Sequence, residues 1–429
     1  MLPPPPTVRS TLVFIGVTFF FFDVEYAIIL PSVLLYINAL GGSSPLWLGA
    51  AVGAVPLASA LTAPIYAWYL DRYKLSHAMV LAFVCQIAGS LWYALASSPA
   101  HVVAARFLCG CGNMMVIAYT YIGVALHDET ERSVWSAKVG GISKLGMLLG
   151  PAFQLAFVHV SIRFPALGLS VTSLNAPGWF LFLCFTALFL LLPLFYCEPV
   201  RFVDATARQA LINDEEDDVV AAPKVRVFTP GLVSLLVAKF VSQFYQMVLE
   251  TILTPLTKDV YQFGALENSY LYSGIALVAA VSMLTIMFAS SKKVLDRTLI
   301  YCGQVLEGVG VALLAAFWWN SGDGSLFPSV WVGLVVPAVV LVFGEPFMWT
   351  PVSALGMKVS HQSRQGAAQS WLSAADSAAS IMAPLIASLF VKDETTNLRP
   401  LCILLMCLWA ANTVVFFFTH RALKPPGRT

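Results

Sequence analysis

Residues 11–40 of the chain read TLVFIGVTFFFFDVEYAIILPSVLLYINAL, a stretch in which only Asp23 and Glu25 carry a charge. The hydrocarbon core of a bilayer is about 30 Å thick, and a helix needs roughly 20 apolar residues to cross it. This stretch is therefore predicted to cross a membrane as a helix. Its apolar part is too long for the core of a cleavable signal peptide, so we expect it to remain in the mature protein.

The apolar character of this stretch extends over the whole chain. Of the 429 residues, 59% are hydrophobic and 11% are charged, and the mean hydropathy is +0.79. A soluble domain has about 25% charged residues, so most of the surface of this protein must face lipid. The predicted spans cover residues 11–40, 47–70, 78–97, 101–126, 136–160, 178–197, 230–257, 268–290, 298–319, 328–355, 367–391 and 400–420. Strands are excluded from these spans because an open sheet cannot satisfy its backbone in lipid.

The sequence repeats itself with a nearly constant offset. Glu25 matches Glu250, and Leu70-Asp71-Arg72 matches Leu295-Asp296-Arg297, both at an offset of 225 residues. Further matches are Gly150-Pro151 with Ala383-Pro384 and Arg132, in the loop before span five, with Arg364. Repeats of this kind predict two six-span halves in the same orientation. The predicted fold class is an all-α membrane protein of twelve transmembrane helices in two pseudo-symmetric six-helix halves.

Four segments follow from this division: residues 1–197 form the N-terminal half, 198–229 a linker, 230–420 the C-terminal half and 421–429 a tail. Of the 24 Lys and Arg residues, 17 fall on the side that holds both termini and four on the other side. Positive residues favour the cytoplasmic side, so linker, tail and both termini are predicted to be cytoplasmic. The acidic run Asp214–Asp218 in the linker is interpreted as solvated, with a partner-binding or regulatory element as the alternative.

Charged residues within the spans are the candidates for function, because each costs about 2.5–3.5 kcal/mol to insert. They are Asp23, Glu25, Arg106, Lys144, Lys239, Glu250, Glu307, Glu345 and Asp376. Lys239 and Glu250 are eleven residues apart, which places them within about 20° of one helix face and about 16 Å apart along it. We expect both, with Glu25 and Arg106, to line a substrate or ion cavity. A structural ion pair that braces the bundle is the alternative for these charges, and Trp349 is expected in an aromatic belt.

Other function classes have little support. No nucleophile–base pair or metal-ligand spacing is found outside the spans, so we expect no enzyme activity, no cofactor and no metal site. The net charge of +1 gives no reason to expect nucleic acid as a partner. The expected partners are the lipid bilayer and a small-molecule or ion substrate, and the chain is expected to be monomeric. The eight cysteines are interpreted as small buried hydrophobes.

Three short motifs resemble signatures of the major facilitator superfamily. Ala67-x3-Asp71-Arg72 is similar to its loop signature, and Asp296-Arg297 repeats the charged pair. The resemblance implies a gating role for both pairs, with a positive-inside anchor as the alternative. The second and third signatures are rich in small residues, which let neighbouring helices approach closely. They are Arg106-x3-Gly110-x-Gly112 in span four and Gly146-x3-Gly150-Pro151 in span five.

A more specific resemblance lies in the second half. Residues 250–261, ETILTPLTKDVY, resemble the corresponding stretch of the ceroid-lipofuscinosis type seven family, also called major facilitator superfamily domain-containing protein 8. Leu149–Gln154 and Gln365-Gly366 are similar to that family as well. The resemblance implies an endolysosomal membrane protein linked to solute transport and anion conductance.

Three functions are open at this point. The first is a carrier of a small solute or ion that works by alternating access and is coupled to protons through Glu25 and Glu250. The second is an endolysosomal anion (chloride) channel on the same fold, lined by Arg106, Lys144 and Lys239. The third is a receptor or adaptor without transport activity that acts through the acidic linker.

Overall fold

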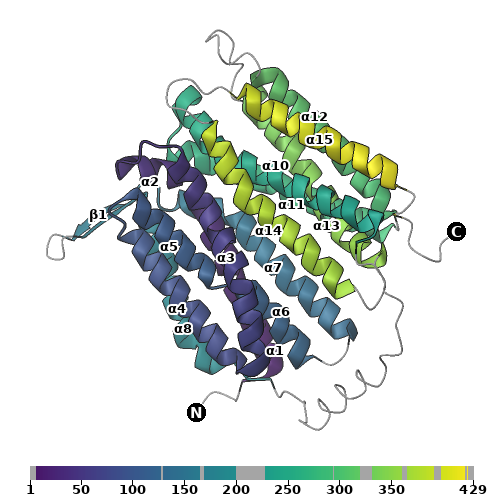
Figure 1. Cartoon of the computed structure of the whole chain (residues 1–429). Coiled ribbons are helices and arrows are strands. Elements are labelled where there is room, and N and C mark those ends of the chain that lie inside the picture. Colours follow the sequence, from purple (N-terminus) through teal and green to yellow (C-terminus); the bar gives the residue numbers. More distant parts are fainter. Residues whose placement is uncertain are drawn as a thin grey trace, which may run out of the picture.

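The computed structural model describes residues 6–126, 129–164, 169–199, 228–292, 294–318, 331–359, 365–390, 398–420 and 423. Within these ranges the protein is a bundle of long helices that divides into two halves (Figure 1). Residues 200–227 and 424–429, which hold most of the predicted linker and tail, lie outside the described residues.

Helices of the N-terminal half are α1 (Val8–Ile28), α2 (Val33–Ala39), α3 (Leu46–Arg72), α4 (Leu75–Ala94), α5 (Pro99–Cys111), α6 (Met114–Ala125), α7 (Glu129–Leu155) and α8 (Ala176–Phe195). Helices of the C-terminal half are α10 (Pro230–Tyr261), α11 (Ala265–Ser291), α12 (Asp296–Trp318), α13 (Val336–Val359), α14 (Gln365–Leu389) and α15 (Arg399–Thr419). A π-helical turn, Trp331–Val335, leads into α13.

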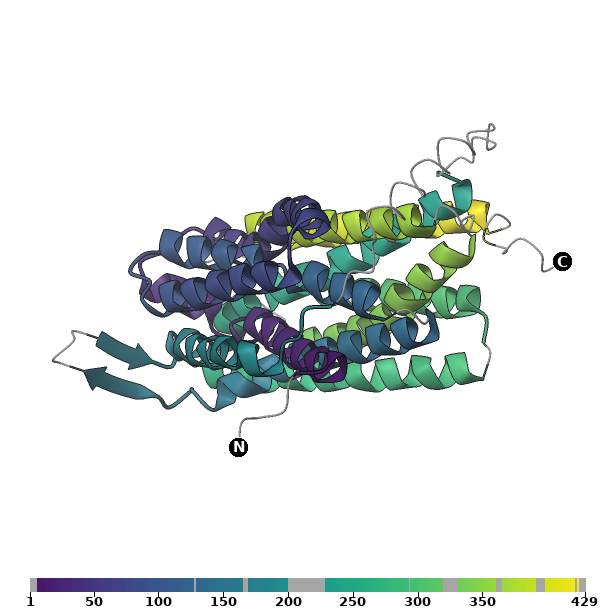
Figure 2. The ribbon, with the colours of Figure 1, turned by 90° about the horizontal axis from the view of Figure 1, so that it is seen from below.

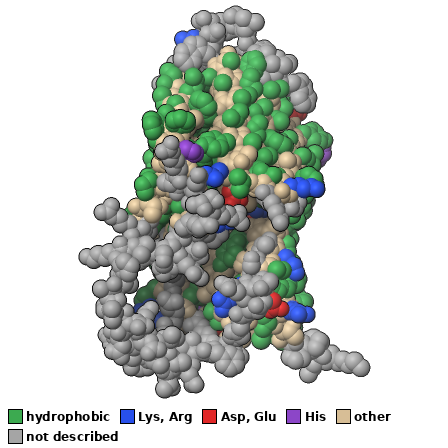
Figure 3. Space-filling view, turned by 90° about the vertical axis from the view of Figure 1, so that its right-hand side faces the viewer, with side chains coloured by type: hydrophobic (Ala, Val, Ile, Leu, Met, Phe, Trp, Pro, Cys, Tyr) green, Lys and Arg blue, Asp and Glu red, His purple; other side chains and the backbone are tan. Residues whose placement is uncertain are grey.

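The outer surface has the composition of a membrane protein. Eleven of the described helical segments are long and apolar enough to cross a bilayer. Side chains on α11 and α15, such as Leu277 and Phe418, are largely exposed although they are apolar. Hydrophobic side chains cover much of the described surface in Figure 3, and most of the charged groups visible there lie in the middle and lower part of that view. The protein is therefore an integral, multi-pass membrane protein.

Helix α7 supplies the twelfth span and corrects two expectations. It begins seven residues before the predicted start at residue 136, and Arg132, expected in the preceding loop, lies in its first turns. The Arg132 Nε donates to the Leu126 carbonyl oxygen at 2.6 Å. Charged residues from Glu129 to Lys144 make α7 too polar for the pattern of a continuous apolar span.

Two predicted spans are broken helices. Span one is interrupted between α1 and α2 at Pro31, whose ring and missing N–H disrupt helical hydrogen bonding. Span four is interrupted between α5 and α6 at Gly112, whose backbone packs against α4. A Cβ atom at Gly112 would lie 2.9 Å from the carbonyl oxygen of Ala82.

A β-hairpin departs from the all-helical expectation. Strands β1 (Ser161–Phe164) and β2 (Leu169–Thr172) pair antiparallel between α7 and α8, with Ser161 opposite Thr172. The hairpin projects beyond the helices in Figure 2, so it does not conflict with the exclusion of strands from the spans. The fold is nearly, but not entirely, α-helical.

The two halves contact each other along α3 with α14 and along α7 with α11. Gly49 and Gly53 of α3 face Pro384 and Ser388 of α14. In the same region the Thr254 hydroxyl of α10 donates to the Leu30 carbonyl oxygen at 3.0 Å. We call this end of the bundle, formed by α2, the start of α3 and the ends of α10 and α14, the closed end. It is opposite the end at which α1 begins and α15 finishes (Figure 1).

Candidate functional site

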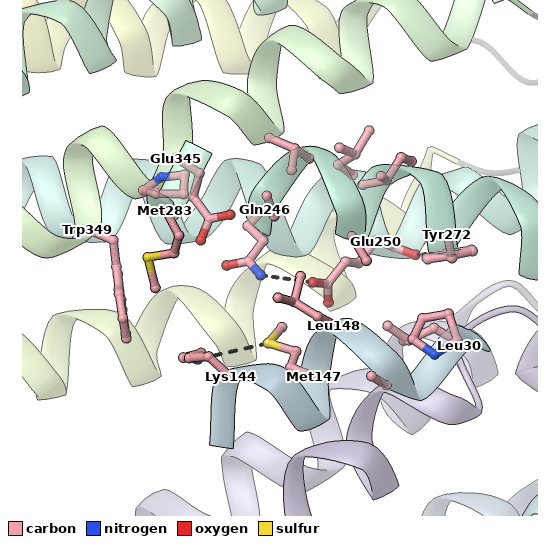
Figure 4. Close-up of a pocket in the computed structure, with 18 of the residues that line it drawn as sticks. Leu30, Lys144, Met147, Leu148, Gln246, Glu250, Tyr272, Met283, Glu345 and Trp349 are labelled. Atoms are coloured by element: carbon pink, nitrogen blue, oxygen red, sulfur yellow. Dashed lines mark hydrogen bonds between the residues drawn. The ribbon is translucent and has the colours of Figure 1, made fainter. Parts of the chain in front are cut away.

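A cavity of about 190 Å³ lies between the two halves. Its wall is formed by α1 and α7 from the N-terminal half and by α10, α11, α13 and α14 from the C-terminal half. The polar side chains in the wall are Lys144, Gln243, Gln246, Glu250, Tyr272, Glu345, Trp349 and Asp376. The remaining wall is mainly aliphatic and thioether side chains, including Met147, Leu148 and Met283 (Figure 4).

One face of α10 supplies much of the polar wall. Gln243, Gln246 and Glu250 follow one another at intervals of three and four residues, which keeps side chains on one face of a helix. Lys239 continues this face one turn earlier but is itself buried and does not line the cavity. The sequence predicted this shared face for Lys239 and Glu250, and only Glu250 reaches the wall.

Glu250 links the two halves. Its Oε1 accepts a hydrogen bond from Gln246 Nε2 on the same helix at 3.0 Å. Its Oε2 accepts one from the hydroxyl of Tyr26, on α1, also at 3.0 Å. Glu250 forms no ion pair with any residue that the structure describes. An acidic group in the cavity wall is thus held by neutral partners, one of them from the opposite half.

Glu25 and Arg106 occupy a different place from the expected one. They form an ion pair with each other inside the N-terminal half, where their side chains are 5% and 1% exposed. The Arg106 Nη1 also donates to the Glu25 carbonyl oxygen at 3.3 Å. Neither residue is part of the cavity wall. The pair lies behind Tyr26, whose ring centroid is 5.5 Å from the Arg106 guanidinium carbon.

Lys239 also has a charged partner. Its Nζ lies 3.3 Å from Asp376 Oδ1 and 4.1 Å from the centroid of the Trp349 ring. The Trp349 Nε1 donates to the same Asp376 oxygen at 3.3 Å. Trp349 was expected in an aromatic belt, but its ring lies at the cavity because it packs against ammonium groups. Its spacing of four residues from Glu345 on α13 was a signal that could have placed it there.

Lys144 and Glu345 complete the charged wall from opposite sides. Lys144, on α7, places its Nζ 4.7 Å from the Trp349 ring centroid and 3.9 Å from the sulfur of Met147. Glu345, on α13, lines the cavity across from it (Figure 4). The sequence singled out both as charged residues within spans, but it named Lys144 only for the alternative anion channel and did not choose Glu345 for the cavity, because spacing along one helix cannot show which faces of two helices meet.

The glycine motifs lie at close contacts between helices. A Cβ atom at Gly146 would collide with the carbonyl oxygen of Phe20 on α1, and one at Gly150 would lie 2.6 Å from the Cβ of Ala27. A Cβ at Gly110 would lie 2.8 Å from that of Ala58 on α3. These contacts agree with the close helix approach that small residues permit. Pro151, next to Gly150, is part of the cavity wall.

The two charged loop motifs differ in what the structure shows. The side chain of Asp71 lies outside the described part, and Arg72 donates to the carbonyl oxygen of Trp68 at 3.1 Å. Asp296 forms an ion pair with Lys358 at 2.6 Å, which joins the start of α12 to the end of α13. Arg297 is partly buried. Their gating role stays a prediction.

Among the described residues, no group of three or more His, Cys, Asp and Glu side chains is placed to hold a metal ion. The polar groups of the cavity are instead acids, amides, a lysine and aromatic rings. This combination can bind a small polar or charged solute, and it can take up or release protons.

Comparison with known proteins identifies the fold. The sequence is 25% identical over 313 residues to major facilitator superfamily domain-containing protein 8 of Xenopus laevis, a match that covers 69% of this chain and 61% of that protein. The chain thus spans about three fifths of the length of that relative.

Two solved structures share the architecture over nearly the whole chain. A bacterial homologue of the human lysosomal transporter Spinster, in an inward-facing and occupied conformation, superposes with a TM-score of 0.75 at 14% identity and covers 96% of this chain and 97% of that one. A D-xylose-proton symporter gives a TM-score of 0.71 at 15% identity, covering 96% and 98%. Because the sequence profile of the Major Facilitator Superfamily matches residues 13–298, two thirds of the chain, this protein belongs to that superfamily of membrane transporters.

Proposed function

We propose that this chain carries a small solute across the membrane by alternating access, with the central cavity as the binding site and Glu250 as the proton-coupling group. The observation that carries the proposal is the position of Glu250. It faces the cavity, has no ion-pair partner among the described residues, and is hydrogen-bonded to Tyr26 of the other half. A change in the charge of Glu250 therefore acts on a contact between the two halves.

Comparison with the repeat mate of Glu250 supports this choice. Glu25 is neutralised by Arg106, whereas residues 331–345, the region of the C-terminal half that corresponds to Arg106, contain no Lys or Arg. An uncompensated carboxylate is costly within a membrane protein, so binding a proton or a cationic group relieves that cost at Glu250. The charge of Glu25 is already compensated by Arg106, and we propose that this ion pair stabilises the packing of the N-terminal half.

The arrangement of the halves supports an inward-facing state. The cross-half contacts at Gly49, Gly53 and Thr254 gather at the closed end, and both termini are predicted to be cytoplasmic at the opposite end. The Spinster homologue with a similar fold was solved in an inward-facing conformation. Parting of the closed end would then expose the cavity to the other side of the membrane.

The cavity favours a carrier over an anion channel. Of the three cations expected to line an anion route, Arg106 and Lys239 are ion-paired with carboxylates and Lys144 alone reaches the wall. Three carboxylates share that wall, which opposes the passage of anions. The adaptor hypothesis concerns the acidic linker, which lies outside the described residues. The endolysosomal membrane stays a prediction, supported by the likeness to domain-containing protein 8.

Uptake into proteoliposomes tests the proposal. Radiolabelled sugars, nucleosides and amino acids are offered to the purified full chain with and without an imposed pH gradient. We expect the gradient to drive uptake of at least one probe, and we expect Glu250→Gln to lose this dependence while it still exchanges the probe across the membrane. The exposed Glu267→Gln serves as the matched control and should behave as wild type.

Two results would contradict the proposal. Full gradient dependence in Glu250→Gln would remove the coupling role of this residue. Unitary current steps in planar bilayers, in place of saturable uptake, would show a channel.

A further inference from the structure

Opposite charges lie on opposite walls of the cavity. The described cation of the wall, Lys144, comes from the N-terminal half, and the three carboxylates, Glu250, Glu345 and Asp376, come from the C-terminal half. We propose that the cavity binds a small zwitterion with an apolar side group, its anionic group against Lys144 and its ammonium group against Glu345. This inference rests on the proposed transport function and names its class of substrate.

Lys144 is available to an anionic group. Its Nζ forms no ion pair among the described residues and contacts the Trp349 ring at 4.7 Å and the Met147 sulfur at 3.9 Å, while the Asp23 carboxylate of α1 attracts it from a longer distance. A cation on an aromatic face keeps its N–H groups free to donate, so Trp349 holds the ammonium group in the wall without using up its hydrogen bonds. A carboxylate of the solute would supply the missing charge-assisted partner.

Glu345 is the carboxylate that a solute ammonium group can best reach. Asp376 is already paired with Lys239 and accepts from Trp349, and Glu250 accepts from Tyr26 and Gln246. Glu345 makes no hydrogen bond or ion pair with any residue in the described ranges, although it lines the cavity. It is therefore the acid with unused acceptor capacity.

A zwitterion satisfies both walls at once, and simpler ions do not. An anion would pair with Lys144 and leave Glu345 without a partner, and an organic cation would do the reverse. Leaving a buried charge unpaired costs more than a neutral hydrogen bond returns, so the opposed charges select for a solute that carries both signs. Such a solute would also bridge α7 and α13 and thereby draw the two halves together.

The volume of the cavity and the apolar part of its wall determine the size and the side group of the solute that it can bind. At about 190 Å³ the cavity is smaller than the roughly 300–1,000 Å³ typical of pockets for drug-sized ligands, so a small solute is expected. Met147, Leu148 and Met283 provide an apolar surface between the charged groups (Figure 4). Methionine side chains adapt to different shapes, which suits an aliphatic side group of variable form.

Thermal stabilisation of the purified full chain tests the proposal with L-leucine, N-acetyl-L-leucine and L-leucinamide. The acetyl derivative lacks the ammonium group, and the amide lacks the carboxylate. We expect L-leucine to raise the melting temperature and each derivative to bind about ten- to a hundredfold more weakly, the effect of losing one charge-assisted hydrogen bond. Equal stabilisation by all three compounds, or none by L-leucine, would overturn the proposal.

Two variants test which residue binds the carboxylate of the zwitterion and which binds its ammonium group. Lys144→Gln should lose the preference for L-leucine over L-leucinamide, and Glu345→Gln should lose the preference over N-acetyl-L-leucine. The exposed Lys292→Gln and Glu267→Gln are the matched controls and should keep both preferences. A variant that still binds one derivative is folded, so a changed preference cannot result from misfolding. Unchanged preferences in both cavity variants would refute the assignment.

The outcome separates this inference from the transport proposal. If L-leucine is inert but a sugar or nucleoside is taken up with the pH gradient, the cavity is a transport site for another class of solute. If no probe moves in wild-type proteoliposomes, the transport proposal fails, whatever L-leucine does to the melting temperature.

Discussion

At the scale of single residues, the equivalent carboxylates of the two halves, Glu25 and Glu250, have different partners. Glu25 is compensated by Arg106 within its own half, and Glu250 is held by the neutral groups of Tyr26 and Gln246. The compensated acid is buried away from the cavity, and the uncompensated one lines it. The two halves thus hold one acid that is paired within its own half and one that neutral partners hold in the cavity wall.

Removing one partner of the buried Glu25–Arg106 pair should lower the free energy of unfolding more than removing both. Arg106→Gln leaves Glu25 buried without a counter-charge, a loss of about 3–5 kcal/mol in the free energy of unfolding. The double variant Glu25→Gln/Arg106→Gln removes both charges and should recover part of that loss. Lys358→Gln, which breaks the exposed pair with Asp296, should cost no more than about 1 kcal/mol. Thermal unfolding in detergent measures all three, and a double variant less stable than the single one would contradict the pairing.

At the scale of the helices, close packing of α1 against α7 depends on two glycines. Gly146 and Gly150 bring α7 against the backbone of α1 near Phe20 and Ala27. Both helices contribute to the cavity wall, α1 through Ala27 and α7 through Lys144 and Pro151, and Leu30 joins them from the turn after α1. The position of Lys144 in the wall therefore depends on how closely these helices approach.

Adding one methyl group at Gly146 should push α1 and α7 apart. In Gly146→Ala the new Cβ collides with the Phe20 carbonyl oxygen, a backbone atom that cannot move aside, and the cost should be about 1–3 kcal/mol. Gly141→Ala on the same helix has open space at its Cβ and should be neutral or stabilising by about 0.5–1 kcal/mol. The melting temperatures of the two variants measure the difference. Equal values would show that the α1–α7 contact does not limit stability.

The sequence predicted those features of the fold that depend on local composition. Apolar length indicated the spans, and small residues at Gly110, Gly146 and Gly150 indicated close helix contacts that the structure contains. The start of α7 was missed because its first turns are charged, and a span at the centre of a bundle need not present an apolar surface all round. The hairpin was missed because its strands are only four residues long.

The site was only partly predictable from the sequence, because its ion pairs form between residues on different helices. Glu25 and Arg106 are 81 residues apart, and their pairing depends on how the bundle places α1 relative to α5. Spacing along α10 indicated that Lys239 and Glu250 share a face, but it could not show that Asp376 of α14 would hold Lys239 in a buried position. Which charges line a cavity and which are buried depends on these contacts between distant segments.

At the scale of the whole molecule, the distribution of contacts between the halves sets the direction in which they can move. The contacts of α3 with α14 and of α10 with the turn between α1 and α2 lie at the closed end. In the proposed alternating-access cycle, a movement that reverses access must break them. Glycines on α3 make this interface close, and a close interface between two rigid halves can be locked by a single covalent bond.

A disulfide across the closed end should stop transport. A Cβ at Gly53 would lie 4.0 Å from the Cβ of Pro384, within the 3.5–4.5 Å range of disulfides. Oxidised Gly53→Cys/Pro384→Cys should lose uptake of the probe that wild-type protein moves, and reduction by dithiothreitol should restore it, because the halves can part again. The single variants control for the native cysteines and for loss of the proline. A protease site inserted after residue 213 reports the bond, since the cleaved halves stay joined on a non-reducing gel only if it has formed. Uptake at the wild-type rate by fully cross-linked protein would mean that solute moves without parting of α3 and α14, and alternating access at this interface would be excluded.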